Sequence, residues 1–361
     1  NDFKETDCPM KRILPVILFA ALLQTMSAQP VLKTMLRLPD TGQITGYTTT
    51  FGEDNDFTIN PPFYHVNGDG TVTDTVTGLM WQQADGPEMT YANAIHYCDT
   101  LTVGGYMDWR MPNAHESFSI LYHQRPNPAI DINVFSATTA EYWWTSDVQI
   151  NDTSKVWVTN AGGGVGNHRK IETISAGGTK RFQVRAVRDV IVPATIPAHF
   201  TNNGNGTVTD NLTGLTWQSF QSSDSITWEQ ALQYADTATT GGQTDWRLPN
   251  IKELQSISDP LLVGPSLPAT FFSVVNSGKY WSSTSLPNQT TKAWYLDTQF
   301  GITTYDFKTI RHYLLCVRGN LPLINLVYEP SKKELPVAFP NPFSSRITLR
   351  AALKSSTVIL F

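Results

Sequence analysis

The chain has 361 residues, of which 40% are hydrophobic and only 16% are charged, and its formal net charge at pH 7 is −5. That length is enough for two domains of roughly 100–200 residues each, and the 24 Gly, 22 Pro and 10 Trp favour short strands and loops over a helical bundle. The acidic balance argues against nucleic acid as a partner, which would favour a basic stripe, and it provides no general attraction to anionic membranes.

A secretory signal peptide is predicted near the N-terminus. Residues 10–28, MKRILPVILFAALLQTMSA, begin with two basic residues, continue with an apolar run of about eleven residues and end on a small-residue cleavage site. The apolar run is shorter than the roughly twenty residues of a membrane span. We therefore expect translation to start at Met10, cleavage to follow Ala28, and the mature protein not to span the membrane. Residues 1–9 are interpreted as an unrelated upstream extension.

An internal repeat is the most informative feature of the sequence. Residues 67–74 (NGDGTVTD) recur as residues 203–210 (NGNGTVTD), 136 residues later. Residues 104–113 (GGYMDWRMPN) recur as residues 241–250 (GGQTDWRLPN), 137 residues later. Because the spacing is nearly constant and only two copies are present, the pattern indicates a duplicated domain rather than a solenoid.

Both copies predict the same series of elements. The Gly-Thr-Val-Thr-Asp and Gly-Leu-x-Trp-Gln runs alternate apolar and polar residues around a turn, which is typical of a β-hairpin. An amphipathic helix follows, over residues 91–99 in the first copy and 228–236 in the second, where Thr227 and Gln230 form a capping-box pattern. A second helix begins after a Pro at Asn113 and at Asn250, each with Glu three positions on. Short strands are predicted in the second copy at 280–284, 293–298 and 313–318. The fold class is therefore α+β.

Several ordered motifs resemble a known family. The runs DGTVTDTVTGLMWQ, GGYMDWRMPN, TDWRLPNIKEL, YWSST and AWYLD resemble domain of unknown function 1566, also called the Lcl C-terminal domain after a collagen-like bacterial adhesin. Residues 38–57 resemble a segment that often precedes such domains. The resemblance implies two tandem C-type-lectin-like domains, a fold shared with formylglycine-generating enzymes, in an exported, surface-associated protein without established catalysis.

The C-terminal residues resemble a second family. Residues 339–343, FPNPF, resemble the start of a type IX secretion sorting domain, a small β-sandwich that directs export across the outer membrane. The resemblance implies the type IX secretion machinery as a partner and a secreted or outer-surface location. A Pro-rich turn before an ordinary hairpin is the alternative. The predicted organisation is an extension and signal peptide at 1–28, a lead-in segment at 29–60, repeat A at 61–190, a linker at 191–198, repeat B at 199–320, a linker at 321–336 and a truncated sorting domain at 337–361.

The residues that both copies keep are interpreted mainly as structural. The Asp-Trp-Arg-x-Pro-Asn motif offers an acid, a guanidinium and a flat ring, which would also suit an anion or sugar site. Its retention in both copies, beside loops that diverge, favours an arginine–carboxylate pair below the loop and a core tryptophan. The predicted structural residues are Trp81, Asp108, Trp109, Arg110, Trp143, Trp157, Arg188, Trp217, Asp245, Trp246, Arg247, Trp281, Trp294 and Arg318. The Gly-Asp-Gly loop lacks the spaced oxygen ligands of an EF-hand, so no metal site is predicted.

Ligand contacts are predicted where the copies differ on a shared scaffold. Trp144 replaces Ser282 beside a retained Tyr-Trp pair, and strand alternation would expose Tyr295 if Trp294 points inward. Exposed rings flanked by Asp, Asn and Arg suit stacking on a sugar or contact with a protein, although ordinary loop residues remain the alternative. The candidate ligand-binding residues are Trp144, Val158, Asn160, His168, Arg169, Tyr295, Asp297, Tyr305 and Lys308.

Two cysteines follow the signal peptide. Cys98 corresponds to Ala235 in repeat B, and Cys316 corresponds to Ala186 in repeat A. The family resemblance implies a disulfide within one domain, but here each copy keeps one half of it. Two buried free thiols, each packed against an alanine, are one hypothesis. A strand exchange that pairs Cys98 with Cys316 is the other, and it would stabilise the chain by roughly 4–5 kcal/mol.

No catalytic site or cofactor is predicted. The histidines lie at unmatched positions in the two copies, so no Ser-His-Asp or metal cluster repeats. The enzymes that share the fold use paired cysteines, which neither copy has. The favoured function is a non-catalytic binding module or adhesin for an extracellular glycan or surface protein. A structural envelope or matrix component is the alternative, and an enzyme is the least favoured.

Overall fold

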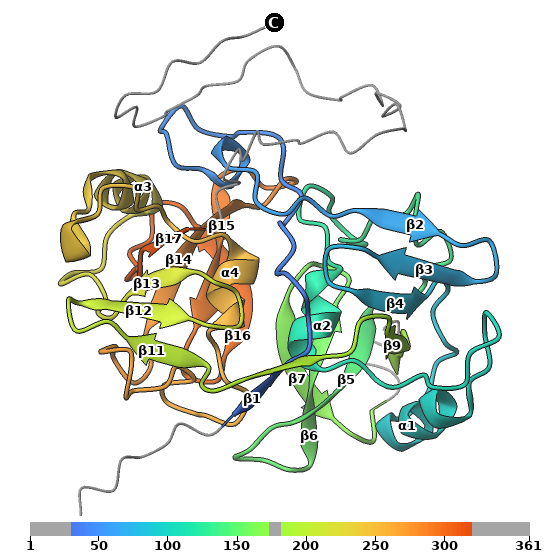
Figure 1. Cartoon of the computed structure of the whole chain (residues 1–361). Coiled ribbons are helices and arrows are strands. Elements are labelled where there is room, and N and C mark those ends of the chain that lie inside the picture. The colour runs from blue at the N-terminus through green and yellow to red at the C-terminus, as the bar shows by residue number, and fades with distance from the viewer. Residues whose placement is uncertain (1–29, 173–181, 320–361) are drawn as a thin grey trace, which may run out of the picture. The chain divides into compact units, whose positions relative to one another are not determined.

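The computed structural model describes residues 30–172 and 182–319, which lie in one compact unit ending at Pro322. The predicted signal peptide at 1–28, the linker and sorting domain at 321–361, and Cys8 lie outside the described residues. Within them the chain is mostly sheet with few helices, in two tandem repeats of the same α+β plan (Figure 1).

Each repeat contains a four-stranded antiparallel sheet built on the predicted hairpin. In repeat A the strand order is β2 (Tyr64–Val66), β3 (Thr71–Asp74), β4 (Leu79–Gln82) and β9 (Val187–Asp189). In repeat B it is β11 (Phe200–Asn202), β12 (Thr207–Asp210), β13 (Thr216–Gln218) and β17 (Val317–Arg318). The hairpins β3–β4 and β12–β13 confirm the predicted pairing, with Val72 opposite Trp81 and Val208 opposite Trp217.

The two repeats share a second, seven-stranded sheet. Repeat B contributes β14 (Lys279–Ser285), β15 (Lys292–Asp297) and β16 (Ile302–Phe307). Repeat A contributes β7 (Val165–Arg169), β6 (Lys155–Asn160), β5 (Tyr142–Val148) and β8 (Phe182–Gln183), the last of which runs parallel to β5. The repeats join where β16 meets β7, at Thr303 opposite Val165, whose backbone N–H donates to the Thr303 hydroxyl at 2.7 Å.

The helices begin where the capping patterns predict. The described residues contain the α-helices α1 (Tyr91–Thr100), α2 (Ala114–Ser119), α3 (Trp228–Thr237) and α4 (Ile251–Ser256). Capping boxes form at Asn113 with Glu116, at Asn250 with Glu253 and at Thr227 with Gln230. In each box the side chains of the two residues satisfy backbone donors that the first helical turn leaves open. Helices α2 and α4 pack against each other between the repeats (Figure 1).

The lead-in segment is an integral part of this fold. Its strand β1 (Val31–Lys33) pairs with β10 (Ala194–Ile196) of the linker between the repeats. Further along, a 3-10 helix at Asp54–Asp56 reaches repeat B, where the Thr284 hydroxyl donates to the Asp54 carboxylate at 2.6 Å. The Ser285 N–H donates to the Gln43 side-chain oxygen at 2.8 Å. Because Gln43, Asp54 and Thr284 are all buried, these contacts fix the segment to repeat B.

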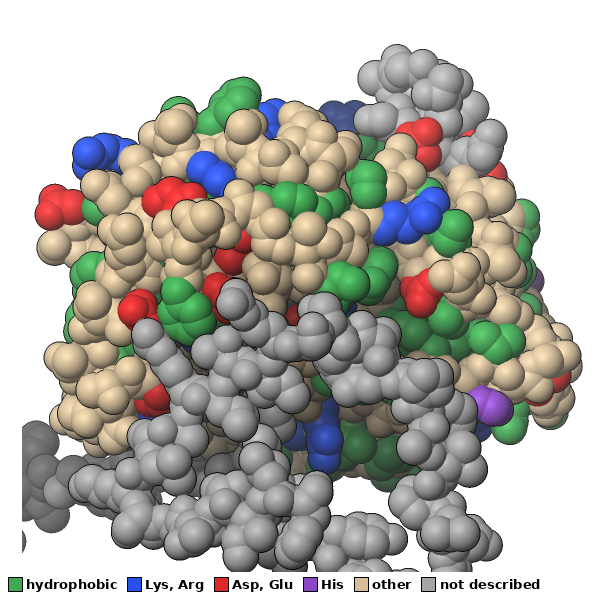
Figure 2. Space-filling view, turned by 90° about the horizontal axis from the view of Figure 1, so that it is seen from above, with side chains coloured by type: hydrophobic (Ala, Val, Ile, Leu, Met, Phe, Trp, Pro, Cys, Tyr) green, Lys and Arg blue, Asp and Glu red, His purple; other side chains and the backbone are tan. Residues whose placement is uncertain are grey.

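The motif tryptophans form the interior of both repeats. Trp81, Trp109, Trp143, Trp157, Trp217, Trp246, Trp281 and Trp294 are all buried. The described surface shown in Figure 2 is mainly uncharged polar side chains and backbone, with Lys, Arg, Asp and Glu scattered across it. This distribution agrees with the low charged fraction of the sequence.

Candidate functional site

Three of the predicted ligand residues are wrongly placed by the sequence argument, because Trp144, Val158 and Tyr295 are buried. The prediction assumed that one face of each strand meets solvent. In the shared sheet β6 and β15 lie between other strands, and their central residues are buried on both faces. Tyr295 packs against Trp281 and His312, at ring-centroid distances of 6.2 and 4.6 Å, while Trp294 faces the other core. These three residues therefore belong to the core and not to a ligand site.

The structure corrects the sequence alignment at Trp144, whose equivalent in repeat B is Trp281 and not Ser282. In repeat A, Tyr91 begins α1 and lies edge-on to Trp144, whose indole N–H donates to the Met89 carbonyl at 2.9 Å. In repeat B the corresponding helix begins with Trp228, whose indole N–H donates to the Ser282 carbonyl at 2.8 Å. The Trp281 indole N–H donates to the Ile226 carbonyl at 3.0 Å, as the Trp144 indole N–H does to the Met89 carbonyl. Both repeats therefore keep a tryptophan at this strand position, and the helix differs independently, with Tyr91 in repeat A and Trp228 in repeat B.

Lys308, His168 and Asp297, which are also predicted ligand residues, have local partners within the chain. The Lys308 ammonium lies over the Trp228 ring, 3.8 Å from its centroid, in a cation–π contact. Burial lowers the pKa of this lysine, with Glu53 and Glu229 opposing the shift. His168 Nδ1 lies 2.8 Å from the Glu172 carboxylate, and Asp297 accepts the Gln299 N–H at 2.9 Å. Arg169 is exposed and is the last residue of β7.

The two remaining candidates, Asn160 and Tyr305, meet in one pocket. This cavity has a volume of about 270 Å³ and is named the sheet-end pocket. It lies where the start of β5 and the end of β6 approach β16 and the turn between β14 and β15. It is lined by Pro126, Asn127, Glu141, Tyr142, Asn160, Ala161, Gly162, Leu286, Asn288, Gln289 and Tyr305. Repeat A contributes the first seven of these residues and repeat B the last four, so the pocket requires both repeats.

The aromatic and amide groups of the pocket are held in place by their neighbours. Tyr305 is 39% exposed and stands edge-on to Trp294, with ring centroids 5.4 Å apart. Tyr142 stacks on Phe182 at 4.9 Å. The Asn160 side-chain oxygen accepts the backbone N–H groups of Gly162 and Gly164, at 2.9 and 3.3 Å, which fixes the orientation of the amide. The pocket is thus preorganised.

The chemistry of the pocket suits an uncharged polar ligand. Among the described residues Glu141 is the only carboxylate in the lining, which contains no Lys, Arg or His. The Lys292 ammonium, outside the lining, lies 5.1 Å from the centroid of the Tyr305 ring. Four amide side chains and two phenols supply both donors and acceptors. Small-molecule sites combine apolar walls with a few placed polar groups, and an exposed phenol ring beside amides provides a stacking surface with hydrogen-bond partners.

Sequence reasoning missed most of this pocket. Glu141, Tyr142 and Asn127 lie outside the loops that were compared, and Asn288 and Gln289 lie in a hairpin that was not assigned a role. Tyr142 carried a misleading signal, because its match with Tyr280 is out of register and Lys279 stands at its position in repeat B. The sequence carried no signal for the contact between the repeats, because the pocket forms from segments of two copies that neither copy contains by itself.

The repeated Asp-Trp-Arg motif forms ion pairs below its loop. Arg110 contacts Glu116 at 2.7 Å and Asp189 at 2.8 Å, and Arg247 contacts Glu253 at 2.6 Å. The exposed Asp108 and Asp245 pair with Arg188 and Arg318, at 2.7 and 2.6 Å. The hydrogen bond from Arg188 lowers the pKa of Asp108. Trp109 and Trp246 lie in the cores, so these motif contacts are structural.

Cys98 and Cys316 are free, buried thiols in separate cores. Cys98 shares its cluster with Ala186, and Cys316 shares its cluster with Ala235, as the packing hypothesis predicts. Burial raises the pKa of Cys98 to about 12, so this thiol stays protonated and unreactive at neutral pH. The strand exchange with a Cys98–Cys316 bridge is therefore wrong for this structure.

Within residues 30–172 and 182–319, no group of three or more His, Cys, Asp or Glu side chains is arranged to hold a metal ion. Over the same ranges no helix has the length and apolar character required to cross a membrane.

Comparison with known proteins agrees with the repeat structure. The model of the Lcl C-terminal domain family matches residues 70–188 and again residues 206–318, together more than half of the chain. A search of curated proteins found no match. Each match begins at the residue directly before β3 or β12 and ends in the last strand of a repeat, β9 or β17. The chain therefore belongs to the Lcl C-terminal domain family and carries two copies of its domain in tandem.

Proposed function

We propose that this protein is a secreted or surface-attached, non-catalytic binding module that holds an uncharged glycan unit in the sheet-end pocket. The observation that carries the proposal is the pocket itself, in which Tyr305 of repeat B faces the amide and carboxylate groups of repeat A. The aromatic ring would stack on the apolar face of the sugar, and the side chains of Asn160 and Glu141 would bond to its hydroxyls. The volume of about 270 Å³ suits a single sugar unit.

Several features of the chain agree with an extracellular binding role. The signal-peptide pattern at 10–28 and the sorting-domain pattern at 339–343 support export by the type IX machinery. The C-type-lectin-like resemblance supports ligand binding on a rigid scaffold. The free cysteines lie in different cores, which argues against the paired-cysteine chemistry of related enzymes. We therefore place the protein outside the cell, as an adhesin.

A glycan array followed by calorimetric titration of the best ligand tests the proposal. Tyr305→Ala should weaken binding about tenfold or more, because loss of a stacked ring costs on the order of 1–2 kcal/mol. Glu141→Gln should weaken it less, since one hydrogen-bond acceptor remains. Asn167→Ala is the matched control, because Asn167 lies opposite Trp157 on β7 as Tyr305 lies opposite Trp294 on β16. The control variant should bind like the unmodified protein.

Two results would count against this function. A protein that binds no glycan in the array, yet assembles into insoluble matrix or envelope material, would favour the structural alternative. Binding that survives Tyr305→Ala and Glu141→Gln unchanged would place the ligand elsewhere. If the protein instead binds a surface protein and Tyr305→Ala abolishes that binding, the site is correct and the ligand is a protein rather than a glycan.

A further inference from the structure

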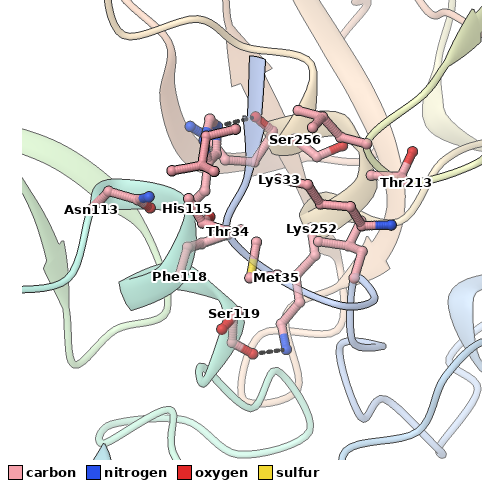
Figure 3. Close-up of a pocket in the computed structure, with 14 residues that line it drawn as sticks. Lys33, Thr34, Met35, Asn113, His115, Phe118, Ser119, Thr213, Lys252 and Ser256 are labelled. Carbon is pink, nitrogen blue, oxygen red and sulfur yellow. Dashed lines mark hydrogen bonds between the residues drawn. The ribbon is translucent and has the colours of Figure 1, made fainter. Parts of the chain in front are cut away.

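A second cavity lies at the junction of the repeats, where α2 meets α4. This helix-junction cavity has a volume of about 160 Å³ and is closed on one side by β1 of the lead-in segment (Figure 3). Its apolar wall includes Met35, Leu38 and Phe118. In Figure 3 Met35 is drawn between Phe118 and Lys252, so an apolar side chain separates the two helices at this point. The cavity is chemically distinct from the sheet-end pocket.

The ionisable side chains among the described residues that line this cavity are all basic, namely Lys33, His115 and Lys252. The carboxylates of Asp40, Asp54 and Asp74 act on Lys252 from outside the lining. His115 and Lys252 occupy equivalent positions in the two repeats, each the second residue of its helix. His115 Nε2 bonds to the Gln255 carbonyl at 3.0 Å, which fixes the imidazole ring against α4. A basic lining around an apolar wall is complementary to an anion that has an apolar body.

The lysine amine has spare hydrogen-bonding capacity. Lys252 is buried, and its Nζ donates to the carbonyl oxygens of Asp40 and Ser119, both at 2.7 Å. An ammonium has three donors, so two neutral carbonyls leave one donor unused among the described residues. Burial lowers the pKa of Lys252 to about 8, against the opposing charges of nearby carboxylates. A buried ammonium without a directly bonded carboxylate is a favourable partner for an incoming anion.

The size of the cavity limits the ligand to a compact molecule. An apolar protein cavity of about 150 Å³ accommodates benzene, and the helix-junction cavity is of comparable volume. The ligand body is therefore one six-membered ring or a short alkyl chain. Its charged group must be small enough to reach the lysine without displacing the helices.

We propose that the helix-junction cavity binds a small monocarboxylate with a compact apolar body. The carboxylate bonds to the free donor of Lys252, with Lys33 adding long-range attraction. The ring or chain of the ligand packs against Met35, Leu38 and Phe118. Because β1 forms one wall, the bound ligand also holds the lead-in segment against both repeats. This site is independent of the proposed glycan site.

Calorimetric titration of the full chain with benzoate, and with benzyl alcohol as the uncharged analogue, tests the site. Benzoate should bind saturably with one site per chain, and benzyl alcohol should bind at least tenfold more weakly because it lacks the charge that Lys252 requires. Equal affinity for the two probes would overturn the proposal. So would the absence of saturation with benzoate up to about 10 mM, since this exceeds the millimolar range expected of one ring and one ion contact.

Two variants separate this site from other modes of binding. Lys252→Met should abolish the preference for benzoate over benzyl alcohol. Because this variant also leaves two carbonyls without their donor, Leu212→Trp provides a second test that fills the cavity from the turn between β12 and β13 and keeps the lysine. Benzoate binding should be lost in Leu212→Trp and unchanged in Tyr305→Ala. Retained binding in the correctly folded Leu212→Trp variant would overturn the proposal.

Discussion

The same arginine motif has different surroundings in the two repeats. Arg110 of repeat A is a half-exposed residue, with 36% of its side chain accessible, and it divides its guanidinium between Glu116 and Asp189. Arg247 of repeat B has only 3% accessible and pairs with Glu253 alone. The lead-in segment accounts for the difference, because it covers repeat B and places the Phe57 ring below the Arg247 guanidinium, at 5.4 Å. A duplicated motif can therefore keep its geometry while its energetic role changes.

The strand position beside each second helix shows the same asymmetry. In repeat A the Asp147 carboxylate accepts the first N–H of α2, from Ala114, at 2.8 Å. In repeat B Thr284 stands at that position and accepts the Ile251 N–H at 3.0 Å, while donating its own hydroxyl to Asp54. The carboxylate near the start of α4 in repeat B therefore comes from the lead-in segment, as Asp54. Repeat A uses Asp147 of its own strand β5.

The largest expected effect comes from removing the two motif arginines. Arg247→Met should lower the free energy of unfolding by about 3–5 kcal/mol, because it leaves the Glu253 carboxylate buried without its partner. Arg110→Met should cost less, on the order of 1–2 kcal/mol, since solvent reaches that pair. Urea denaturation of both variants measures the difference. Equal losses would show that the lead-in segment does not set the energetics.

The next effect tests the acid that the lead-in segment supplies. Asp54→Ala leaves the buried hydroxyls of Thr41 and Thr284 without their acceptor and should cost about 2–3 kcal/mol. Asp147→Ala, the matched change in repeat A, removes one helix-capping acceptor and should cost about 1 kcal/mol. Denaturant titration of both proteins provides the comparison. A cost for Asp54→Ala no greater than for Asp147→Ala would contradict it.

A smaller effect should appear in the pH dependence of stability. Burial raises the pKa of Asp40 from 3.8 to about 6. The folded chain therefore takes up this proton more readily than the unfolded chain, and the free energy of unfolding should increase by about 1–3 kcal/mol as pH falls from 6 to 4. Unfolding curves at several pH values measure this slope. Asp40→Asn should flatten it, and an unchanged slope in that variant would assign the effect to other groups.

The smallest effects are expected at the exposed ion pairs that both repeats retain. Asp108→Asn and Asp245→Asn remove surface partners of Arg188 and Arg318, and each should cost less than about 1 kcal/mol. Thermal unfolding of the two variants should give similar small shifts, because the lead-in segment reaches neither pair. If only one of the two variants loses more than about 2 kcal/mol of unfolding free energy, the two repeats also differ at this ion pair.

Local structure was predictable from the sequence because its determinants are local. The capping residues Asn113 and Asn250, and the turns of the β3 and β12 hairpins, act on backbone groups a few positions away, so the pattern carried the information. The exposure of Tyr295 was not predictable, because it depends on neighbouring strands and on the core that covers both faces of β15. The equivalence of Trp144 with Trp281 was missed because the Tyr-Trp pairs at 142–143 and 280–281 match in sequence one residue out of the register that the strands adopt.

The candidate site was only partly predictable for the same reason. Asn160 and Tyr305 stood out because each follows a retained tryptophan strand, yet nothing in either copy indicated that they meet. Their meeting depends on the pairing of β16 with β7, where one residue of each strand is matched. The buried Gln43 and Asp54 were also missed, since polar residues in a loop-like segment ordinarily indicate exposure.

The pairing of β7 with β16 has a consequence for any attempt to divide the chain. Separation of the repeats would turn β7 and β16 from internal strands into edge strands with unpaired backbone groups. Expression of either repeat by itself is therefore expected to yield a fragment that self-associates through its new edge strand.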